Sequence, residues 1–224
     1  MMNDLFFKLQ HAVEGKDAEG AVREAFRILP ADRLVLASSL SIEDQVLTHL
    51  ACAVHPKPRI FTLDTGRLFP ETYDVMQRTR ERCKIRFEVL VPDAVDLSEM
   101  VSEHGPNLFY ESKEKRKLCC EVRKIRPLRK ALAGAEAWIC GLRSGQGETR
   151  IEIEPVEWDS VFGLFKINPL HDWTEEHVRE YIRSRDVPYN ALHDRGFPSI
   201  GCTPCTRAVR PGEDPRAGRW WWES

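Results

Sequence analysis

The sequence predicts an α/β protein built on a doubly wound, mostly parallel sheet with helices on both faces. Short apolar runs of strand length alternate with amphipathic runs of helix length through the first two thirds of the chain, which is typical of parallel sheets. The loops after three of these strands are rich in Ser, Asp, Arg and Gly. Ligands of parallel sheets bind at the carboxyl ends of the strands, so these loops are the first candidates for a site.

The expected elements alternate regularly until the last third of the chain. Helices are expected at 21–26, 43–54, 71–83, 94–105 and 113–132, and strands at 33–38, 59–64, 86–91 and 137–142. A hairpin or irregular strand pair is expected at 156–170, then a helix at 174–186, and ordered loops follow Pro188 because Gly and Pro become frequent.

Four residues mark expected helix boundaries or bends. Pro70 suits the first turn of a helix, Gly105 suits a helix end, and Pro127 predicts a break or bend in the basic helical segment. Thr174, followed by a glutamate, predicts a capping box at the start of the last helix.

Length and composition predict one domain over 1–224. Its nucleotide-binding α/β core is expected at about 30–170, and a C-terminal helical and loop segment at about 171–224. We expect a cytoplasmic protein without a membrane anchor, because there is no leader at the N-terminus and no apolar run near the roughly 20 residues of a membrane span. Seven cysteines, an odd number, also suit a reducing compartment.

Charge is unevenly distributed along a chain whose formal net charge is only −2. Nine Lys and Arg stand against two acids between Lys113 and Lys130, and four more arginines lie near the C-terminus. This local excess favours a small anionic ligand over nucleic acid, which would favour a basic balance over the whole chain. A solvated helix face is an equally good interpretation of 113–117 alone.

Three strand-end loops carry candidate binding residues. The first supplies Ser38, Ser39 and Ser41 before a helix, the second supplies Asp64, Thr65, Gly66 and Arg67, and the third supplies Arg143 and Arg150. Hydroxyl and backbone N–H groups at a helix N-terminus can bind an anion, although serines there are more often helix caps. Convergence of the three loops favours a site of nucleotide size.

Two cysteine pairs suggest a metal centre. Cys119 and Cys120 are adjacent, Cys202 and Cys205 form a CxxC motif, and 81 residues lie between the pairs. Four thiolates suit zinc or an iron–sulfur cluster. Adjacent side chains diverge awkwardly for one tetrahedral ion, which favours the cluster, whereas CxxC alone would also suit a zinc knuckle or a redox disulfide. Cys52, Cys83 and Cys140 are expected to be inert thiols in apolar segments.

The motifs CCEVRKIRPL, GCTPCTRAV, LDTGRLFPETY, PYNALHDRGFPSIG and GRWWWE resemble those of the assimilatory adenylyl-sulfate reductases. These enzymes are the bacterial and plant-type branch of the sulfonucleotide reductase family. The likeness extends from about Ser38 to Glu223 and implies the adenine-nucleotide α-hydrolase-like fold. It also implies a [4Fe-4S] cluster and the reduction of adenosine 5′-phosphosulfate to sulfite and AMP.

The resemblance also implies a role for each candidate residue. Lys124 couples cluster and substrate electrostatically, and the arginines clamp sulfate and phosphate. The nucleotide is held by the first two loops, extended by Asp44 and Leu63. The implied cluster ligands are Cys119, Cys120, Cys202 and Cys205; the arginines are Arg143, Arg150, Arg216 and Arg219; and the loop residues are Ser38, Ser39, Ser41, Asp44, Leu63, Asp64, Thr65, Gly66 and Arg67.

In the family a cysteine attacks the sulfonyl group, and thioredoxin or glutaredoxin reduces the S-sulfocysteine. That cysteine belongs to an ECGLH-like tail, expected beyond Ser224 and not in this chain. A form without it would be a non-catalytic iron–sulfur nucleotide-binding protein. Ser41 also departs from the Gly of many relatives.

The alternative substrate within the family is the 3′-phosphorylated nucleotide. A tRNA-thiolating enzyme would show an SGGxDS-type loop, which ASSLSIEDQ is not, and the acidic helix at 174–186 argues against a DNA-binding regulator. The sequence leaves open whether the chain forms a homo-oligomer.

Overall fold

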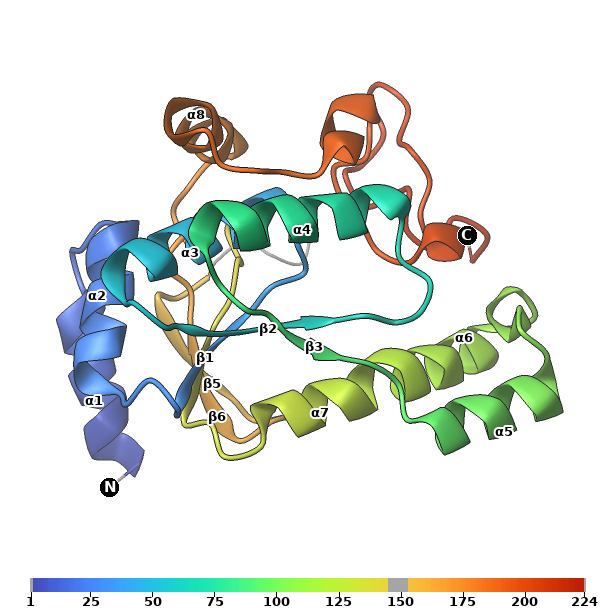
Figure 1. Ribbon diagram of the computed structural model, residues 1–224, viewed down its shortest axis with the longest axis horizontal. Helices are drawn as coiled ribbons and strands as arrows, with labels where there is room; N and C mark the ends of the chain where they lie inside the picture. Colours follow the sequence, from blue (N-terminus) through green and yellow to red (C-terminus); the bar gives the residue numbers. More distant parts are fainter. Residues whose placement is uncertain (1, 145–152, 224) are drawn as a thin grey trace. The chain divides into compact units, whose positions relative to one another are not determined.

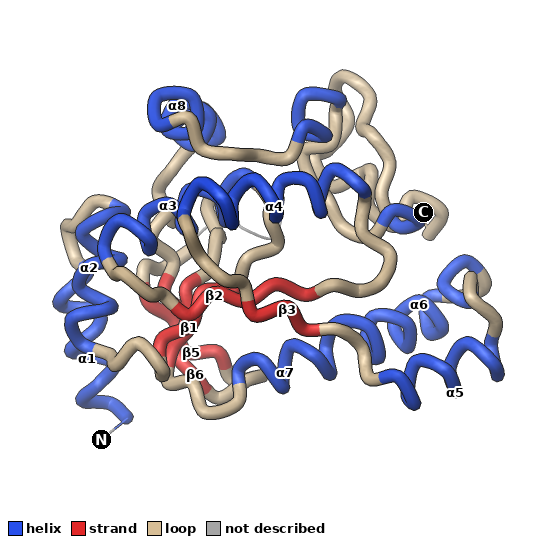
Figure 2. Tube along the Cα trace, in the orientation of Figure 1, coloured by secondary structure: helices blue, strands red, loops and turns tan. Residues whose placement is uncertain are grey.

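The computed structural model describes residues 2–144 and 153–223 and contains one six-stranded sheet (Figure 2). Its strands are β1 (Leu34–Ala37), β2 (Arg59–Leu63), β3 (Glu88–Leu90), β4 (Ala137–Ile139), β5 (Val156–Asp159) and β6 (Leu164–Ile167). The strand order is β3-β2-β1-β4-β6-β5. β1 pairs in parallel with β2 and β4, β4 pairs in parallel with β6, and β5 pairs antiparallel with β6. The predicted mostly parallel α/β fold and the predicted hairpin are both confirmed.

The helices match most of the sequence-based expectations. The α-helices are α1 (Met2–Val13), α2 (Ala18–Ile28), α3 (Ile42–Val54), α4 (Pro70–Cys83), α5 (Ala94–His104), α6 (Lys113–Cys120), α7 (Arg126–Leu132) and α8 (Glu175–Arg185). The shorter turns are the 3₁₀ helices η1 (Leu108–Tyr110), η3 (Ala191–Arg195) and η4 (Thr203–Cys205) and the π-helical turn η2 (Glu121–Ile125). α1 lies where no helix was expected from the sequence.

The direction of strand addition reverses between β1 and β4. The chain passes from β1 to β2 and then to β3 on one side, and β4 is added on the other side of β1. Such a reversal is the topological switch point at which open α/β sheets bind ligands. The loops that follow β1 and β4 therefore lie where the fold favours a site.

The chain divides into two compact units, each with its own hydrophobic core. Unit 1 comprises residues 1–62, 71–88 and 134–191, and unit 2 comprises residues 63–70, 89–133 and 192–224. In unit 1, α3 packs on β1 and α1 packs on β5, around a core that includes Leu36, Leu47 and Ile139. In unit 2, Phe109 and Val122 form a smaller core together with three of the paired cysteines.

Local signals explain several boundaries and one correction. α4 begins at Pro70, and Gly105, with φ of +78°, ends α5 as expected. The basic segment appears in Figure 1 as one continuous helical run from α6 to α7. Its irregularity is the π-helical turn η2, just before Pro127. The capping box of α8 does form, but the partner of Thr174 is His177 rather than a glutamate, because His177 is the residue three positions on.

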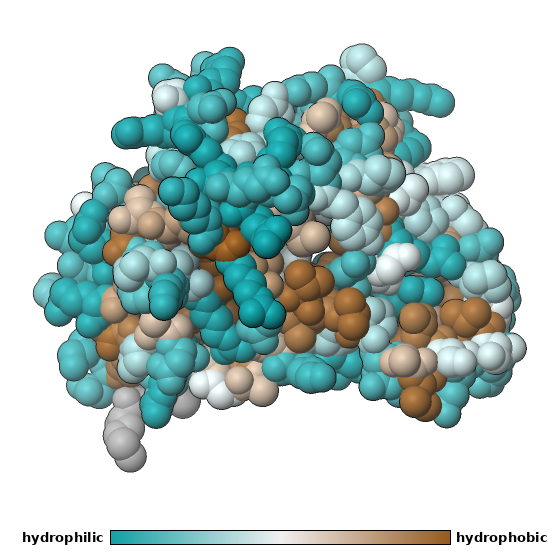
Figure 3. Space-filling model, in the orientation of Figure 1, coloured by the Kyte–Doolittle hydropathy of each residue, from teal (hydrophilic) through white to brown (hydrophobic). Residues whose placement is uncertain are grey.

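Polar side chains dominate one face of the molecule (Figure 3). The face shown in Figure 3 is mostly hydrophilic and carries separate hydrophobic areas. Within the ranges described, no helix is both long enough and apolar enough to cross a membrane.

Candidate functional site

The first candidate site lies in unit 1, in the loops after β1 and β4. We call Ser38, Ser39, Ser41, Asp44 and Arg143 the strand-end site. The loop turns sharply at Leu40, whose φ of +64° places a bulky residue in the left-handed region. Its buried side chain packs in the core of unit 1, which offsets part of the strain of that conformation. The loop therefore reaches the start of α3 in a fixed conformation.

Asp44 fastens both loops of the strand-end site. Its Oδ2 accepts hydrogen bonds from the backbone N–H of Ser39 at 2.6 Å and from the Ser39 hydroxyl at 2.5 Å, and the carboxylate also accepts one from the backbone N–H of Gly141. Burial raises the pKa of Asp44 from its ordinary 3.8 to about 6, against the opposing effect of these hydrogen bonds. A side chain at position 141 would collide with this carboxylate. Asp44 therefore connects the loop after β1 to the loop after β4 by hydrogen bonds to Ser39 and Gly141.

The serines lie at the start of α3, as the sequence predicts. Ser38 is buried, and its hydroxyl accepts a hydrogen bond from the backbone N–H of Leu40 at 3.3 Å. Ser41 is the N-cap residue of α3, but its hydroxyl makes no capping hydrogen bond. The Ser39 and Ser41 hydroxyls lie 3.1 Å apart. The capping interpretation thus applies to the backbone position of Ser41 and not to its side chain.

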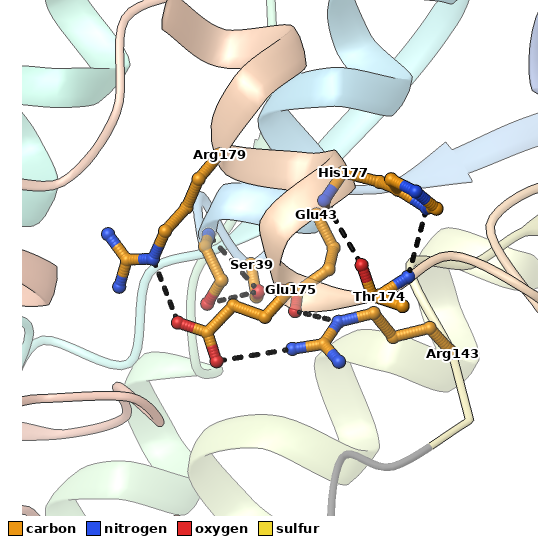
Figure 4. A network of polar contacts seen from close by, with 8 residues as sticks. Ser39, Glu43, Arg143, Thr174, Glu175, His177 and Arg179 are labelled. Atoms are coloured by element: carbon orange, nitrogen blue, oxygen red, sulfur yellow. Dashed lines mark hydrogen bonds and ion pairs between the residues drawn. The ribbon is translucent and has the colours of Figure 1, made fainter.

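Arg143 contacts two carboxylates from two helices (Figure 4). Its Nε donates to Glu43 Oε1 at 2.9 Å, and its Nη2 lies 3.7 Å from Glu175 Oε2. The sequence analysis missed both carboxylates, since Glu43 was expected only as the start of a helix and Glu175 as part of a cap. Arg150, also predicted as an anion clamp, lies outside the described residues.

The second candidate site lies in unit 2 and begins with the loop after β2. This Asp64 loop, residues 63–67, turns at Gly66, whose φ is +70° and whose N–H donates to Asp64 Oδ1 at 2.8 Å. Arg123 Nη1 donates to the Thr65 carbonyl at 2.8 Å, and the Thr203 N–H donates to the Arg67 carbonyl at 2.8 Å. These bonds join the loop to both cysteine-bearing segments.

Aromatic and charged contacts bring the two cysteine pairs together. In α6, Arg116 makes a bidentate pair with Glu223 at 2.6 and 3.0 Å and lies over the Trp220 ring. Tyr110 donates from its hydroxyl to the Pro204 carbonyl at 3.1 Å, and Trp222 donates to the Phe109 carbonyl at 3.2 Å. These contacts hold the CxxC motif against η1 (Leu108–Tyr110) and the residues near Glu223 against η1 and α6.

The four predicted ligand cysteines influence one another. Cys119 and Cys205 are each 7% exposed. Burial raises the pKa of both thiols, that of Cys205 to about 12, and the paired cysteines on the other segment add to the effect. Cys202 Sγ lies 3.2 Å from the Thr65 hydroxyl. The structure thus gathers the four sulfurs in unit 2, although in the part of the chain described here no three His, Cys, Asp or Glu side chains stand in metal-binding geometry.

Three cations accompany these thiols, and we call the four cysteines with Lys124, Arg216 and Arg219 the cysteine site. Burial and the nearby arginines lower the pKa of Lys124, whereas Cys120 and Cys202 raise it. Lys124 nevertheless keeps surface that is accessible to solvent. The surrounding protein therefore removes part of its hydration without enclosing it. Burial and Arg216 likewise lower the pKa of Arg219. Like charges this close favour an anion between or beside them.

Arg219 shows this unsatisfied charge most directly. Its Nη1 donates to the Ser199 hydroxyl at 3.3 Å, and its guanidinium lies over the Trp220 ring. Its Nε is buried without a hydrogen-bond partner among the described residues. Any side chain at Gly201 would overlap the guanidinium, so Gly201 makes room for it.

The remaining cysteines are only partly as expected. Cys140 is buried, and burial raises its pKa well above the ordinary value. Cys52 and Cys83 are half-buried and hydrogen-bonded to each other, a pairing between α3 and α4 that the sequence does not reveal. That bond raises the pKa of Cys52 and lowers that of Cys83.

Comparison with known proteins identifies the family of this chain. Residues 33–208 match the phosphoadenosine phosphosulfate reductase domain. Adenosine 5′-phosphosulfate reductase of Burkholderia cepacia is 51% identical over 193 residues, covering 86% of this chain and 77% of the relative. The enzyme of the same name from Allochromatium vinosum is 50% identical over 193 residues, covering 86% and 75%.

Solved structures share the fold. Phosphoadenylyl-sulfate reductase from Candida auris, in a phosphate complex, superposes with a TM-score of 0.77 at 24% identity, covering 91% of this chain and 96% of that one. Yeast FAD synthetase in complex with FAD superposes with a TM-score of 0.58 at 15% identity, covering 92% and 75%.

A mostly parallel sheet with loops meeting at its switch point is an α/β nucleotide-binding fold. The chain belongs to the phosphoadenosine phosphosulfate reductase domain family, a family of oxidoreductases. The resemblance inferred from the motifs is thereby confirmed.

Proposed function

We propose that this protein reduces adenosine 5′-phosphosulfate to sulfite and AMP in sulfate assimilation. The observation that carries the proposal is the cysteine site, where four cysteines lie with Lys124, Arg216 and Arg219. Relatives about half identical over most of the chain are named adenosine 5′-phosphosulfate reductases. The Candida auris structure, named for the 3′-phosphorylated substrate, keeps that nucleotide as the second candidate.

The donor set of the cysteine site suits a [4Fe-4S] cluster. Two segments supply four soft thiol ligands, and nearby cations offset the negative charge that thiolate ligation brings. Cys119, Cys120, Cys202 and Cys205 would hold the cluster, which would supply a compact, polarizable charge beside the substrate-binding cations. The four positions lie in two segments that the Asp64 loop already joins.

The cations of the cysteine site have an electrostatic role. Lys124 and Arg219 neutralise charge on the transferring sulfonyl group and on the leaving phosphate, which is the part of catalysis that fixed charges perform best. In the strand-end site, Ser39 and Arg143 bind the nucleotide, and Asp44 holds their loops in place. The family resemblance assigns Arg67 and its loop to nucleotide binding as well.

Sulfur transfer itself needs a thiolate. A cysteine expected beyond position 224 attacks the sulfonyl sulfur, the sulfur–oxygen bond to AMP breaks, and an S-sulfocysteine forms. A thioredoxin or glutaredoxin dithiol then reduces it, which releases sulfite and leaves the dithiol as a disulfide. These partners and the reduced cysteines favour a cytoplasmic location, and assembly into a homo-oligomer remains a prediction.

The test compares the two nucleotides. Binding of adenosine 5′-phosphosulfate and of its 3′-phosphorylated form is measured by calorimetry, and sulfite release is measured with thioredoxin and the natural C-terminal continuation. Preference for the first nucleotide supports the proposal, whereas preference for the second assigns the alternative. A sulfonate adduct mapped to Cys52, Cys83 or Cys140 would overturn the assignment of the nucleophile.

A further inference from the structure

Arg143 has two carboxylate partners for its single positive charge. Its side chain is 10% exposed and contacts Glu43, which is 11% exposed, and Glu175, which is 46% exposed. The Arg143 guanidinium therefore already has two carboxylate partners, so an arriving anion is repelled by the carboxylate that it has to replace. An anion can use this guanidinium fully only after one carboxylate has withdrawn.

The two carboxylates are held in different ways. Glu43 lies in the first turn of α3 and accepts a hydrogen bond from Nε at 2.9 Å. Glu175 lies 3.7 Å from Nη2, which is an ion-pair distance beyond ordinary hydrogen-bond length. Buried, hydrogen-bonded Glu43 is the fixed partner, and half-exposed Glu175 is the one that can leave.

Glu175 also has a second partner, which it can keep when it leaves Arg143. Its Oε1 accepts a hydrogen bond from Arg179 Nε at 2.8 Å, one turn along α8 (Figure 4). Withdrawal from Arg143 therefore does not leave Glu175 without a cation, and the rotation of one exposed side chain suffices.

We propose that Glu175 is a displaceable carboxylate that occupies the anion-binding side of Arg143 in the free protein and yields to the phosphosulfate group of the nucleotide. Its role at Arg143 rests on the function proposed above. Glu175 determines specificity because it acts as a competitor: a nucleotide brings adenosine contacts that offset the displacement, whereas inorganic sulfate has only its charge. Glu43 is a positioning residue that keeps the guanidinium aimed during the exchange.

The test uses Glu175→Gln, with Glu176→Gln as its matched control. Both substitutions remove one negative charge from the exposed first turn of α8, so the effect on the helix dipole and on net charge is the same. Affinity for adenosine 5′-phosphosulfate and for inorganic sulfate is measured by calorimetry. Glu175→Gln should tighten both by about threefold or more relative to Glu176→Gln, with the larger factor for sulfate.

A second pair of variants gives an effect of opposite sign. Arg179→Gln removes the alternative partner of Glu175, which should then hold Arg143 more firmly and weaken anion binding. Arg183→Gln, at an exposed position one turn further along α8, removes the same charge and serves as the control. Merely structural damage to α8 would weaken binding in both Glu175→Gln and Arg179→Gln and would overturn the proposal.

The two proposals can fail separately. Equal sulfate affinities in Glu175→Gln and Glu176→Gln would overturn the displacement while leaving nucleotide reduction intact. If the wild-type chain does not bind the nucleotide but Glu175→Gln still binds sulfate more tightly than Glu176→Gln, the displacement stands and the proposed substrate fails.

Discussion

The strand-end site and the cysteine site use arginine in opposite ways. Arg143 is paired with two carboxylates and is neutralised before any ligand arrives. Arg219 is repelled by Arg216, contacts the Ser199 hydroxyl and the Trp220 ring but no carboxylate among the described residues, and has a buried Nε that no described residue satisfies. By the proposals above, the first site exchanges one anion for another, whereas the second binds an anion that its cations lack in the free protein. Removal of a proposed cluster ligand or anion-binding residue should therefore lower stability or nucleotide affinity more in the cysteine site than in the strand-end site.

Replacing Cys202 by Ser should have the largest effect. Cys202 is one of the four proposed cluster ligands, which come from two distant segments, and it contacts the Thr65 hydroxyl at 3.2 Å. Because metal binding free energy is also folding free energy, the variant should lose its iron and become less stable by several kcal/mol, about 3 or more. Iron content, absorbance near 400 nm and urea unfolding measure the effect.

Cys83→Ser is the control for that experiment. Cys83 is a half-buried thiol of unit 1 and contacts Cys52. It should keep full iron content. Stoichiometric zinc in colourless wild-type protein, or unchanged iron in Cys202→Ser, would contradict the ligand assignment.

Arg219→Lys should have the next largest effect, on ligand affinity. The lysine keeps the charge but loses the planar set of donors, including the buried Nε that has no described partner. A lost charge-assisted hydrogen bond corresponds to about 2 kcal/mol, so binding of adenosine 5′-phosphosulfate should weaken by roughly tenfold or more. The exposed Arg210 provides the control, Arg210→Lys, which should bind as the wild type does. Equal affinities in all three proteins would show that the Arg219 guanidinium does not bind the nucleotide.

Comparison with Asp44→Asn should show how protonation of the Asp44 carboxylate changes the free energy of unfolding. The folded state raises the pKa of Asp44 from 3.8 to about 6, so between these values it binds more protons than the unfolded state does. Stability from this group therefore rises as pH falls from about 6 to about 4, by up to about 3 kcal/mol, and is constant above pH 7.

Urea unfolding of wild type and Asp44→Asn at several pH values between 4 and 7.5 measures this effect. The stability of the wild type relative to the variant should increase toward low pH. A difference that does not change with pH would show that the Asp44 carboxyl titrates normally.

The sequence predicts those features of the fold that depend on residues close to one another along the chain. Strand and helix positions, the left-handed end of α5 at Gly105 and the start of α4 at Pro70 follow from local residue preferences. The π-helical turn η2 does not, because Pro127 marks a disturbance without fixing where in the basic segment it forms. The cysteine pairs were recognised because their spacing is specific.

Contacts between distant positions escaped prediction. Glu43 and Glu175 meet at Arg143 although 131 positions separate them, and a glutamate at a helix start is normally explained by the helix dipole alone. The same holds for Cys52 and Cys83, which come from separate helices. Only the packing of α3 with α4 and α8 decides which of these polar side chains become partners.

The smallest effect is expected at the start of α8, for Thr174→Ala. The Thr174 hydroxyl accepts a hydrogen bond from the His177 N–H at 3.2 Å, and its loss should lower the free energy of unfolding by about 1 kcal/mol. The reciprocal contact, from the Thr174 N–H to the His177 ring, is long at 3.5 Å, so His177→Ala should cost less. Urea unfolding of both variants tests the order. Since Thr174 lies in unit 1 and the four cysteines lie in unit 2, iron content should stay unchanged. A larger loss in His177→Ala, or iron loss in either variant, would show that this helix start does more than cap α8.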